Sequence, residues 1–458
     1  MKVVVVGGGI AGLAAARRLE ELVAGVEVVL VERSGRLGGK LLTERDGGYV
    51  VEGGADSFLS RKPRGMGLVE ELGLADELVG RRLENARTFV RRGEELHPLP
   101  EGLTGMIPTN LDALERSGLL SPEGRERLAA EPEIPPAPAG GDESIASFVS
   151  RRLGREAYER LVEPLLTGIY GGDGEQLSLA ATFPNLRALE LEHGSLLRGL
   201  EAQPSPPPGG HQPFVSLRDG MGALAEAAAR SLSRTRLLME RDAVAARPHA
   251  AGYEVELDGG EVLAADGVVL AAPAFVVAEL LEELDAELAD EHAEIPYASS
   301  VIVTLAYRDV GRPLDGYGYL VPRAEGSDVL ACTWSSSKWE SRSPDGVALV
   351  RVYAGRFGGR DVTAASDDDL LSLAREEPRM LGIEGEPVRA WIHRWPRGMP
   401  QYVLGHPERL ERIDAGSGRH PGLALAGAAY RGVGIPDCIH SGEEAARSLV
   451  QSFAAASG

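Results

Sequence analysis

Residues 3–12 of the chain read Val-Val-Val-Val-Gly-Gly-Gly-Ile-Ala-Gly, and this stretch decides the fold. A β-branched run enters a Gly-x-Gly-x-x-Gly turn, and residues 13–23 continue with apolar or small side chains at helical spacing. Residues 26–31 form a second apolar run that ends at Glu32, whose carboxylate can accept hydrogen bonds from ribose hydroxyls about twenty positions after Gly12. Strand, glycine turn, helix, strand and acid in this order predict a dinucleotide-binding site.

The residues of the turn have separate physical roles in such a site. Gly7 permits a tight bend, Gly9 leaves room for a pyrophosphate, and Gly12 lets helix and strand pack closely. Ile10 and Ala11 belong to the same turn, next to the helix N-terminus, where free N–H groups and the positive end of the helix dipole favour phosphate. We therefore predict that these five residues bind the cofactor.

Bulk properties exclude several classes of protein. The chain has 458 residues, which predicts two or three domains. Its net charge of −21 argues against nucleic-acid binding and against attraction to anionic membranes, so an anionic ligand needs local cations. The two cysteines, Cys332 and Cys438, favour a reducing compartment, the cytoplasm. We expect no signal peptide, no transmembrane segment and no metal site, because the histidines are scattered.

A second glycine pair follows the acid at Gly38 and Gly39. It predicts a backbone that stays close to an extended ligand, with Arg36 and Lys40 near its phosphates and Arg33 beside them. The alternative is a glycine-rich surface turn with solvated charges.

A third cluster, Gly53, Gly54 and Ala55, follows a predicted hairpin over residues 41–51. We interpret it as another surface without side chains. Three glycine clusters suit a long cofactor such as FAD better than a nucleotide held at one turn.

The texture of the remaining chain predicts an α/β fold: a Rossmann-like FAD-binding domain, an α+β substrate domain and a helical insert. Residues 87–200 read as mainly helical, residues 203–213 as a proline-rich crossing, and residues 297–400 as an antiparallel sheet. The expected boundaries are the FAD-binding parts 1–85, 211–285 and 415–458, the insert with part of the substrate domain at 86–210, and the substrate sheet at 286–414.

The end of the chain is predicted to return to the cofactor. Gly427 follows a short strand, and Gly434, Ile435 and Pro436 lead into a last helix. Pro436 suits a first helical turn, and the helix N-terminus would stabilise the negative charge of a reduced flavin.

Several motifs together resemble the amine-oxidase-type FAD superfamily, and they lie at residues 7–12, 32, 36–40, 52–57 and 427–436. Within it, the chain is similar to the porphyrinogen oxidases of haem synthesis, at residues 163–173, 182–184 and 395–402. The motif Asp-Ser-Phe-Leu-Ser-Arg-Lys at residues 56–62 is most similar to the soluble Gram-positive type.

This resemblance implies noncovalent FAD, a porphyrinogen substrate and molecular oxygen as acceptor. The implied reaction oxidises coproporphyrinogen III to coproporphyrin III and releases hydrogen peroxide; protoporphyrinogen IX is the alternative substrate. It adds Asp56, Ser57, Val244 and Trp395 to the expected cofactor-binding residues. A ferrochelatase-type pathway enzyme and a peripheral membrane contact are the further partners that it implies.

No side chain is expected to be catalytic, because the flavin itself accepts the hydride. The protein must hold the macrocycle, exclude water and bind propionates. We place Arg61 and Lys62 at the mouth of the substrate pocket, because their loop follows a predicted cofactor-contacting turn. The alternative for both is a solvated loop.

Three other readings share parts of the pattern. A flavin amine oxidase would lack the motif at residues 163–173. A carotenoid-type desaturase should have a more lipophilic insert. A non-catalytic binding protein, similar to Rab GDP-dissociation inhibitors, need not keep flavin-facing glycines at both ends of the chain.

Overall fold

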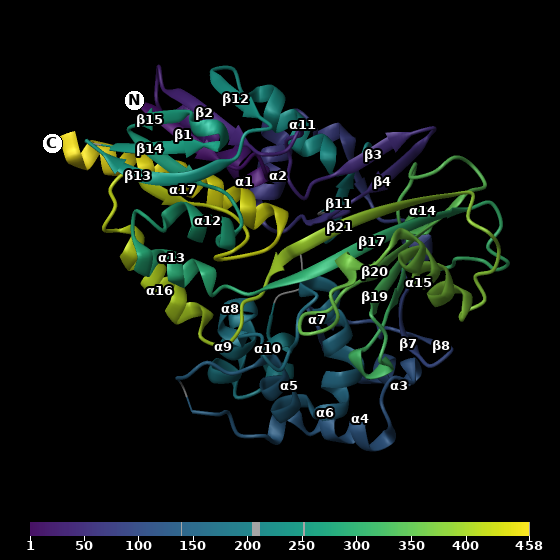
Figure 1. The fold of residues 1–458 in the computed structure, drawn as a ribbon. Coiled ribbons are helices and arrows are strands. Elements are labelled where there is room, and N and C mark those ends of the chain that lie inside the picture. The colour runs from purple at the N-terminus through teal and green to yellow at the C-terminus, as the bar shows by residue number, and fades with distance from the viewer. Residues whose placement is uncertain (139, 204–210, 251, 458) are drawn as a thin grey trace.

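The computed structural model describes residues 1–138, 140–203, 211–250 and 252–457. A five-stranded parallel sheet, in the order β12-β2-β1-β16-β22, organises the upper left of Figure 1. Its strands come from three distant parts of the chain, and they are Thr235–Met239, Glu27–Glu32, Lys2–Val6, Gly267–Leu270 and Leu423–Leu425. The central strands are apolar on both faces, as expected for a parallel sheet covered on each side.

Helices cover both faces of this sheet. One face carries α1 (Ile10–Leu22), α2 (Pro63–Glu71), α11 (Gly222–Ser231) and α17 (Ile435–Ser457), which share one apolar core. The other face carries α12 (Ala274–Leu281), α13 (Ala286–Ala293), α16 (His406–Ser417) and the three-stranded sheet of β13 (Ala243–His249), β14 (Gly252–Leu257) and β15 (Val262–Ala265). Both termini lie at this end of the molecule (Figure 1).

A seven-stranded sheet forms the second large unit, on the right of Figure 1. Its order is β21 (Arg389–Pro400), β17 (Tyr297–Tyr307), β20 (Ala348–Ala354), β19 (Val329–Trp334), β18 (Gly318–Leu320), β7 (Thr88–Arg92) and β8 (Glu95–Pro98). All pairs are antiparallel except β18 with β7. Helix α15 (Asp367–Arg379) packs on it, and its N-cap Ser366 accepts from the backbone N–H of Asp369.

Several short elements complete the fold outside the two large sheets. They are the hairpin β3 (Thr43–Asp46) and β4 (Tyr49–Glu52), the three-stranded sheet of β5 (Phe58–Leu59), β11 (Phe214–Leu217) and β6 (Leu78–Gly80), the pair β9 (Leu103–Thr104) and β10 (Ile107–Pro108), and helix α14 (Ser335–Lys338).

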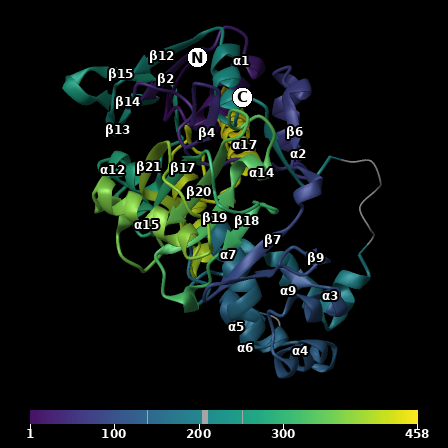
Figure 2. The same ribbon diagram turned by 90° about the vertical axis from the view of Figure 1, so that its right-hand side faces the viewer.

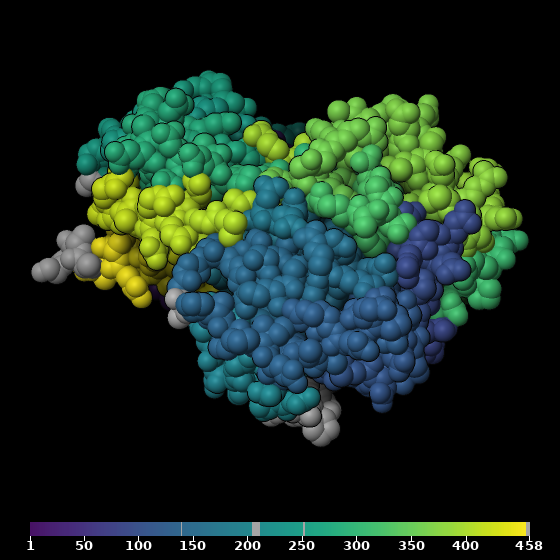
Figure 3. Space-filling model, turned by 90° about the horizontal axis from the view of Figure 1, so that it is seen from below, coloured from purple at the N-terminus to yellow at the C-terminus, as the bar shows by residue number. Residues whose placement is uncertain are grey.

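The insert is a cluster of helices below both sheets. It contains α3 (Leu111–Ser117), α4 (Pro122–Ala129), α5 (Ile145–Leu153), α6 (Arg155–Ala157), a π-turn (Tyr158–Val162), α7 (Glu163–Tyr170), α8 (Leu179–Thr182), α9 (Pro184–His193) and α10 (Leu196–Glu201). Viewed from below, it fills the centre of the face and touches the two sheet-bearing parts on either side (Figure 3). Among the described residues, no helix combines the length and apolar character needed to cross a bilayer.

The predicted α/β fold and its antiparallel second sheet are confirmed, with two corrections. Residues 88–98 were expected to be helical, but they form β7 and β8 and extend the seven-stranded sheet beside β18 (Figure 2). Residues 235–239 carried no strand prediction, yet they form the edge strand β12. The five domain boundaries stay a prediction, and residues 204–210 of the expected proline-rich crossing lie outside the described part.

A buried ion pair holds the insert together. Glu131 and Arg152 are both fully buried, and the Arg152 guanidinium donates to the Glu131 carboxylate and to the carbonyl of Ile134 at 2.8 Å. The same carboxylate accepts the backbone N–H of Leu196 at 2.8 Å, at the start of α10. The pair therefore fastens α5 to α10 through the loop between α4 and α5.

We predict that Arg152→Met destabilises the insert by about 3–5 kcal/mol, because it leaves the Glu131 carboxylate buried without its cation. Hydrogen exchange of the α5 and α10 amides, followed by mass spectrometry, measures the effect locally. The matched control is Arg155→Met, whose ion pair with Glu159 is exposed and is expected to contribute below about 1 kcal/mol. Equal losses in the two variants would contradict the prediction.

Candidate functional site

The glycine turn (residues 7–12) contains two glycines that the packing of the fold requires and one, Gly9, whose Cβ side faces open space. Gly7 has φ +106°, and a Cβ there would lie 2.6 Å from the carbonyl oxygen of Ala271. A Cβ on Gly12 would lie 1.9 Å from the carbonyl oxygen of Gly7. Gly9 has an ordinary φ of −69°, and a Cβ there would meet no atom within 4 Å. Gly9 is also the N-cap of α1 and supplies no side-chain acceptor for the first N–H groups of the helix, which suits an anionic ligand at this place.

The second glycine pair packs against this turn. The N–H of Gly38 donates to the carbonyl of Gly8 at 2.8 Å, and a Cβ on Gly39 would lie 3.1 Å from the Cα of Gly9. Arg36 folds back to donate to the carbonyls of its own loop, while desolvation lowers its pKa and Glu32 opposes this effect. The segment is thus a second wall of the open space and not a free surface turn.

Glu32 stands at the carboxyl end of β2, beside the glycine turn. Its carboxylate accepts the N–H of Gly8 at 2.8 Å and both the N–H and the hydroxyl of Ser34. The backbone N–H of Arg241 donates to the Glu32 carbonyl, which brings the start of β13 to the same place. Val244 lies there on a β-bulge, 47% exposed.

The predicted contact between Arg33 and the cofactor stays a prediction. Its side chain is exposed at the rim, in the turn that follows Glu32.

The third cluster packs closely against other parts of the chain, and its contact with a cofactor stays a prediction. A Cβ on Gly53 would lie 2.6 Å from the ring of His393, and one on Gly54 would lie 1.9 Å from the carbonyl oxygen of Lys40. Their bare faces therefore turn toward the protein and allow this segment to pack tightly. Trp395 donates from its indole nitrogen to the Gly53 carbonyl at 2.7 Å, and the adjacent Ala55 is exposed.

Asp56 forms a charged network that the sequence did not reveal. Its carboxylate accepts from Lys338 at 2.8 Å, from the Trp339 indole at 3.1 Å and from the Ser57 hydroxyl at 2.7 Å. Burial alone would raise the pKa of Asp56, but Lys338 and Arg351 outweigh it and hold the pKa well below its usual range. Asp56 is therefore a fixed anion that joins the first chain segment to the seven-stranded sheet.

Arg351 continues this network along β20. It is buried, and it donates to the Gly54 carbonyl and, at 2.6 Å, to the hydroxyl of Tyr353. Desolvation raises the pKa of Tyr353 to about 12, so its hydroxyl stays protonated at neutral pH. A polar pair two positions apart in an otherwise apolar strand is the sequence signal that could have identified both residues.

Lys40 faces accessible space inside the molecule. Its side chain is exposed, yet desolvation lowers its pKa because protein surrounds that space, and the Cys438 thiol opposes this effect. Cys438 belongs to the first turns of α17, and burial raises its pKa to about 11. The position of Lys40 therefore supports the expected cation beside an anionic ligand.

The closing turn (residues 427–434) leads into α17, which begins at Ile435 with Pro436 in its first turn, as predicted. Gly427 has φ +118°, and a Cβ there would meet no atom within 4 Å. A Cβ on Gly434, by contrast, would lie 2.9 Å from a carboxylate oxygen of Asp437. Gly427 is thus open to a ligand, whereas Gly434 makes room for a side chain.

Arg61 and Lys62 lie on the loop before α2, at the N-terminus of α17. A Cβ on Gly65 in α2 would lie 2.8 Å from Pro436, so the two helix starts are in close contact. Arg61 is exposed, whereas the Lys62 ammonium contacts the Asp437 carboxylate at 2.6 Å. Their role toward the substrate stays a prediction.

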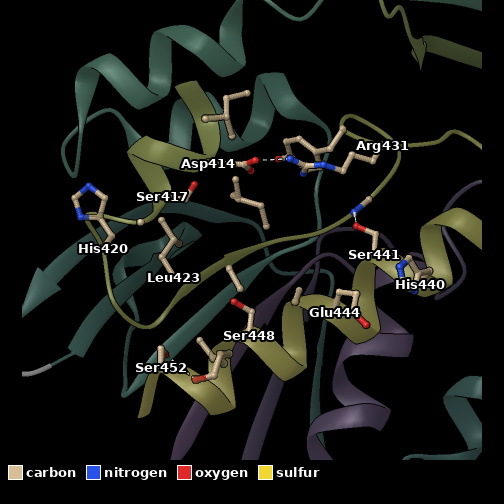
Figure 4. A pocket seen from close by; sticks show the side chains of 18 of the residues that line it. Asp414, Ser417, His420, Leu423, Arg431, His440, Ser441, Glu444, Ser448 and Ser452 are labelled. Atoms are coloured by element: carbon tan, nitrogen blue, oxygen red, sulfur yellow. Dashed lines mark hydrogen bonds and ion pairs between the residues drawn. The ribbon is translucent and has the colours of Figure 1, made fainter. Parts of the chain in front are cut away.

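A separate hollow of about 530 Å³ lies beyond the edge strand β22, between α16 and α17 (Figure 4). It meets the closing turn at Gly427 and Gly432 and helix α17 at Asp437, and Arg431 pairs with Asp414 across its upper side (Figure 4). The glycine turn and Glu32 are not among its walls.

A long dinucleotide with a pyrophosphate fits this arrangement. The features that it would contact are the open space at Gly9, the N-terminus of α1, Glu32 and Lys40. The carboxyl ends of parallel strands are where such ligands bind in this type of sheet. Among the described residues, no group of three or more His, Cys, Asp or Glu side chains could hold a metal ion.

Comparisons with known proteins agree with this arrangement. The sequence profile of the family "Flavin containing amine oxidoreductase" matches residues 10–450. A Bacillus subtilis protein named coproporphyrinogen III oxidase is 36% identical over 97% of this chain and 96% of its own length. A chloroplastic protoporphyrinogen oxidase 1 of Arabidopsis thaliana is 29% identical over 97% of this chain and 87% of its own.

A crystal structure from Exiguobacterium, provisionally named a protoporphyrinogen oxidase, shows the same fold. It superposes with a TM-score of 0.88 at 33% identity and covers 98% of both chains. The predicted FAD cofactor and the predicted enzyme class, an FAD-dependent oxidoreductase, are confirmed by these matches. The chain belongs to the flavin-containing amine oxidoreductase family, in its group of porphyrinogen oxidases.

Proposed function

We propose that the protein oxidises coproporphyrinogen III to coproporphyrin III, with molecular oxygen as the final electron acceptor. The full-length similarity to the Bacillus subtilis protein of that name carries this proposal. Removing six hydrogens from the macrocycle consumes three molecules of oxygen and yields three of hydrogen peroxide. When bound, FAD supplies the acceptor for the hydride that leaves a bridging carbon of the substrate.

The side chains around the open space have binding and positioning roles in this proposal. Gly9 and the N–H groups of α1 receive the pyrophosphate, and Glu32 accepts from a ribose. Lys40 adds a cation inside the space, and the Asp56 network keeps the segment before Arg61 in place. Arg61 and Lys62 bind the propionates of the substrate.

Protoporphyrinogen IX is the second candidate substrate, because a plant relative and a structural neighbour carry names that refer to it. It has two propionates where coproporphyrinogen III has four. A flavin amine oxidase is favoured less, since the putrescine oxidase neighbour shares only 17% identity and shows the fold alone. A ferrochelatase-type enzyme as pathway partner and a peripheral membrane contact belong to the same proposal.

The first test compares the two porphyrinogens side by side with the FAD-loaded protein. The substrates are prepared without oxygen, and the reaction is started by adding air. We expect a clearly higher kcat/KM for the substrate with four propionates. The fluorescence of the porphyrin product measures the rate. Hydrogen peroxide should appear at about three per porphyrin, by the hydrogen balance of the reaction. Equal rates, or a preference for the dipropionate, would reject the choice of substrate.

The second test concerns the cofactor. Gly9→Val places a side chain in the open space before α1, where its Cβ meets no atom within 4 Å, so we expect a folded protein that purifies without flavin absorbance. The matched variant Gly12→Val drives its side chain into the Gly7 carbonyl, and it should lower the melting temperature instead. Normal flavin content in folded Gly9→Val protein would remove this residue from the site.

The third test reverses the charge of Lys62. Lys62→Glu should raise KM for coproporphyrinogen III at least about tenfold, because a cation near the propionates becomes an anion. The control is Lys2→Glu, which reverses a half-buried lysine that also lies in an ion pair, with Glu27, in the parallel sheet. An unchanged KM in Lys62→Glu would support the solvated-loop alternative.

A further inference from the structure

The ion pair between Lys62 and Asp437 joins the substrate loop to the helix at the end of the chain. The Lys62 ammonium lies 2.7 Å and 2.6 Å from the two carboxylate oxygens of Asp437. Side-chain exposure is 42% for Lys62 and 22% for Asp437, so the pair is half open to solvent. An ammonium has three N–H donors, and two oxygens accept from it here.

The closing turn is built around the Asp437 carboxylate. Gly432 has φ +149°, and a Cβ there would lie 2.5 Å from the carboxyl carbon of Asp437. The Cβ of a residue at Gly434 would also touch this carboxylate. Two glycines that the sequence suggests for a flavin surface therefore accommodate an acid, and they fix its direction toward Lys62.

The surroundings of the pair favour anions. Asp437 lies in the first turn of α17, where the helix dipole is positive. The charges of Lys40 and Lys62 both oppose the effect of burial, which raises the pKa of the neighbouring Cys438 thiol. Lys40 is therefore a second cation near the pair. Burial raises the pKa of Tyr170, in helix α7 of the insert, to about 12, and the negative charge of Asp437 adds to this effect.

We propose that Asp437 is a specificity-determining residue that masks the Lys62 ammonium until a substrate carboxylate replaces it. This inference rests on the proposed function, because it requires a substrate that carries carboxylates. A half-exposed ion pair is weak, so a propionate can exchange for Asp437 at small cost. A neutral or cationic ligand gains nothing from the paired Lys62 ammonium, so the pair favours ligands that carry carboxylates over amines and uncharged tetrapyrroles.

The test is Asp437→Asn in the FAD-loaded protein. Removing the competing carboxylate leaves Lys62 free, so the Kd of coproporphyrin III, measured by fluorescence titration, should fall about threefold or more. KM for coproporphyrinogen III should fall by a similar factor. An unchanged or weaker affinity would overturn the inference, and it would show that Asp437 positions Lys62 instead of masking it. Partial unfolding cannot imitate a gain in affinity.

Two further variants isolate the pair. In a Lys62→Met background, Asp437→Asn should have no effect on the Kd, because no cation remains to be unmasked. An equal gain in that background would mean a general charge effect and would reject masking. Glu226→Gln removes the carboxylate of a comparable exposed pair with Arg45, 2.8 Å apart, and should leave the Kd unchanged.

The outcomes separate this inference from the proposed function. If the wild-type protein oxidises coproporphyrinogen III and Asp437→Asn binds the porphyrin no more tightly, only the masking role fails. If the wild-type protein oxidises neither porphyrinogen, the proposed function fails, while the affinity comparison still decides whether Asp437 masks Lys62. A wild-type protein that does not bind coproporphyrin III at all would overturn both.

Discussion

The structure depends on backbone packed directly against backbone at the glycine turn. Gly12 lies against the Gly7 carbonyl, and Gly7 lies against the carbonyl of Ala271. Both contacts are too close to leave room for a Cβ atom. This contact fixes the first helix over the first strand and brings the end of β16 to the same point. Because the packing leaves Gly9 uncovered, one constraint provides both the core of the parallel sheet and the opening for the cofactor.

The same sheet explains why the site has three distant sources. β1 pairs with β2 on one side and with β16 on the other, and β16 in turn pairs with β22 from the end of the chain. The last pairing delivers α17 beside α1. Its N-terminus then meets the loop of Lys62, which follows the first segment, so the residues predicted to bind the cofactor and those predicted to bind the substrate become neighbours.

Charge is organised locally in a strongly acidic protein. Lys338 and Arg351 hold Asp56, and Lys62 contacts Asp437, so cations near the open space have defined partners. Lys40 lies in accessible space within the protein, where desolvation lowers its pKa. A carboxylate-rich ligand therefore meets cations that the fold has placed individually, while the overall charge stays unfavourable to anions.

The sequence by itself determined the dinucleotide unit, since the spacing of Gly7, Gly9, Gly12 and Glu32 is local. The three glycines act through backbone geometry, and Glu32 acts through a carboxylate placed at the end of the adjacent strand. It could not determine the Asp56 network, because Lys338 and Arg351 lie about 300 residues away and only the tertiary packing of the first segment against α14 and β20 brings them together. It also misassigned residues 88–98, whose strands exist because β18 provides an edge. Tertiary structure likewise decided that the Cβ side of Gly53, Gly54 and Gly434 is closely packed, since the atoms that crowd these glycines come from other elements or from a side chain.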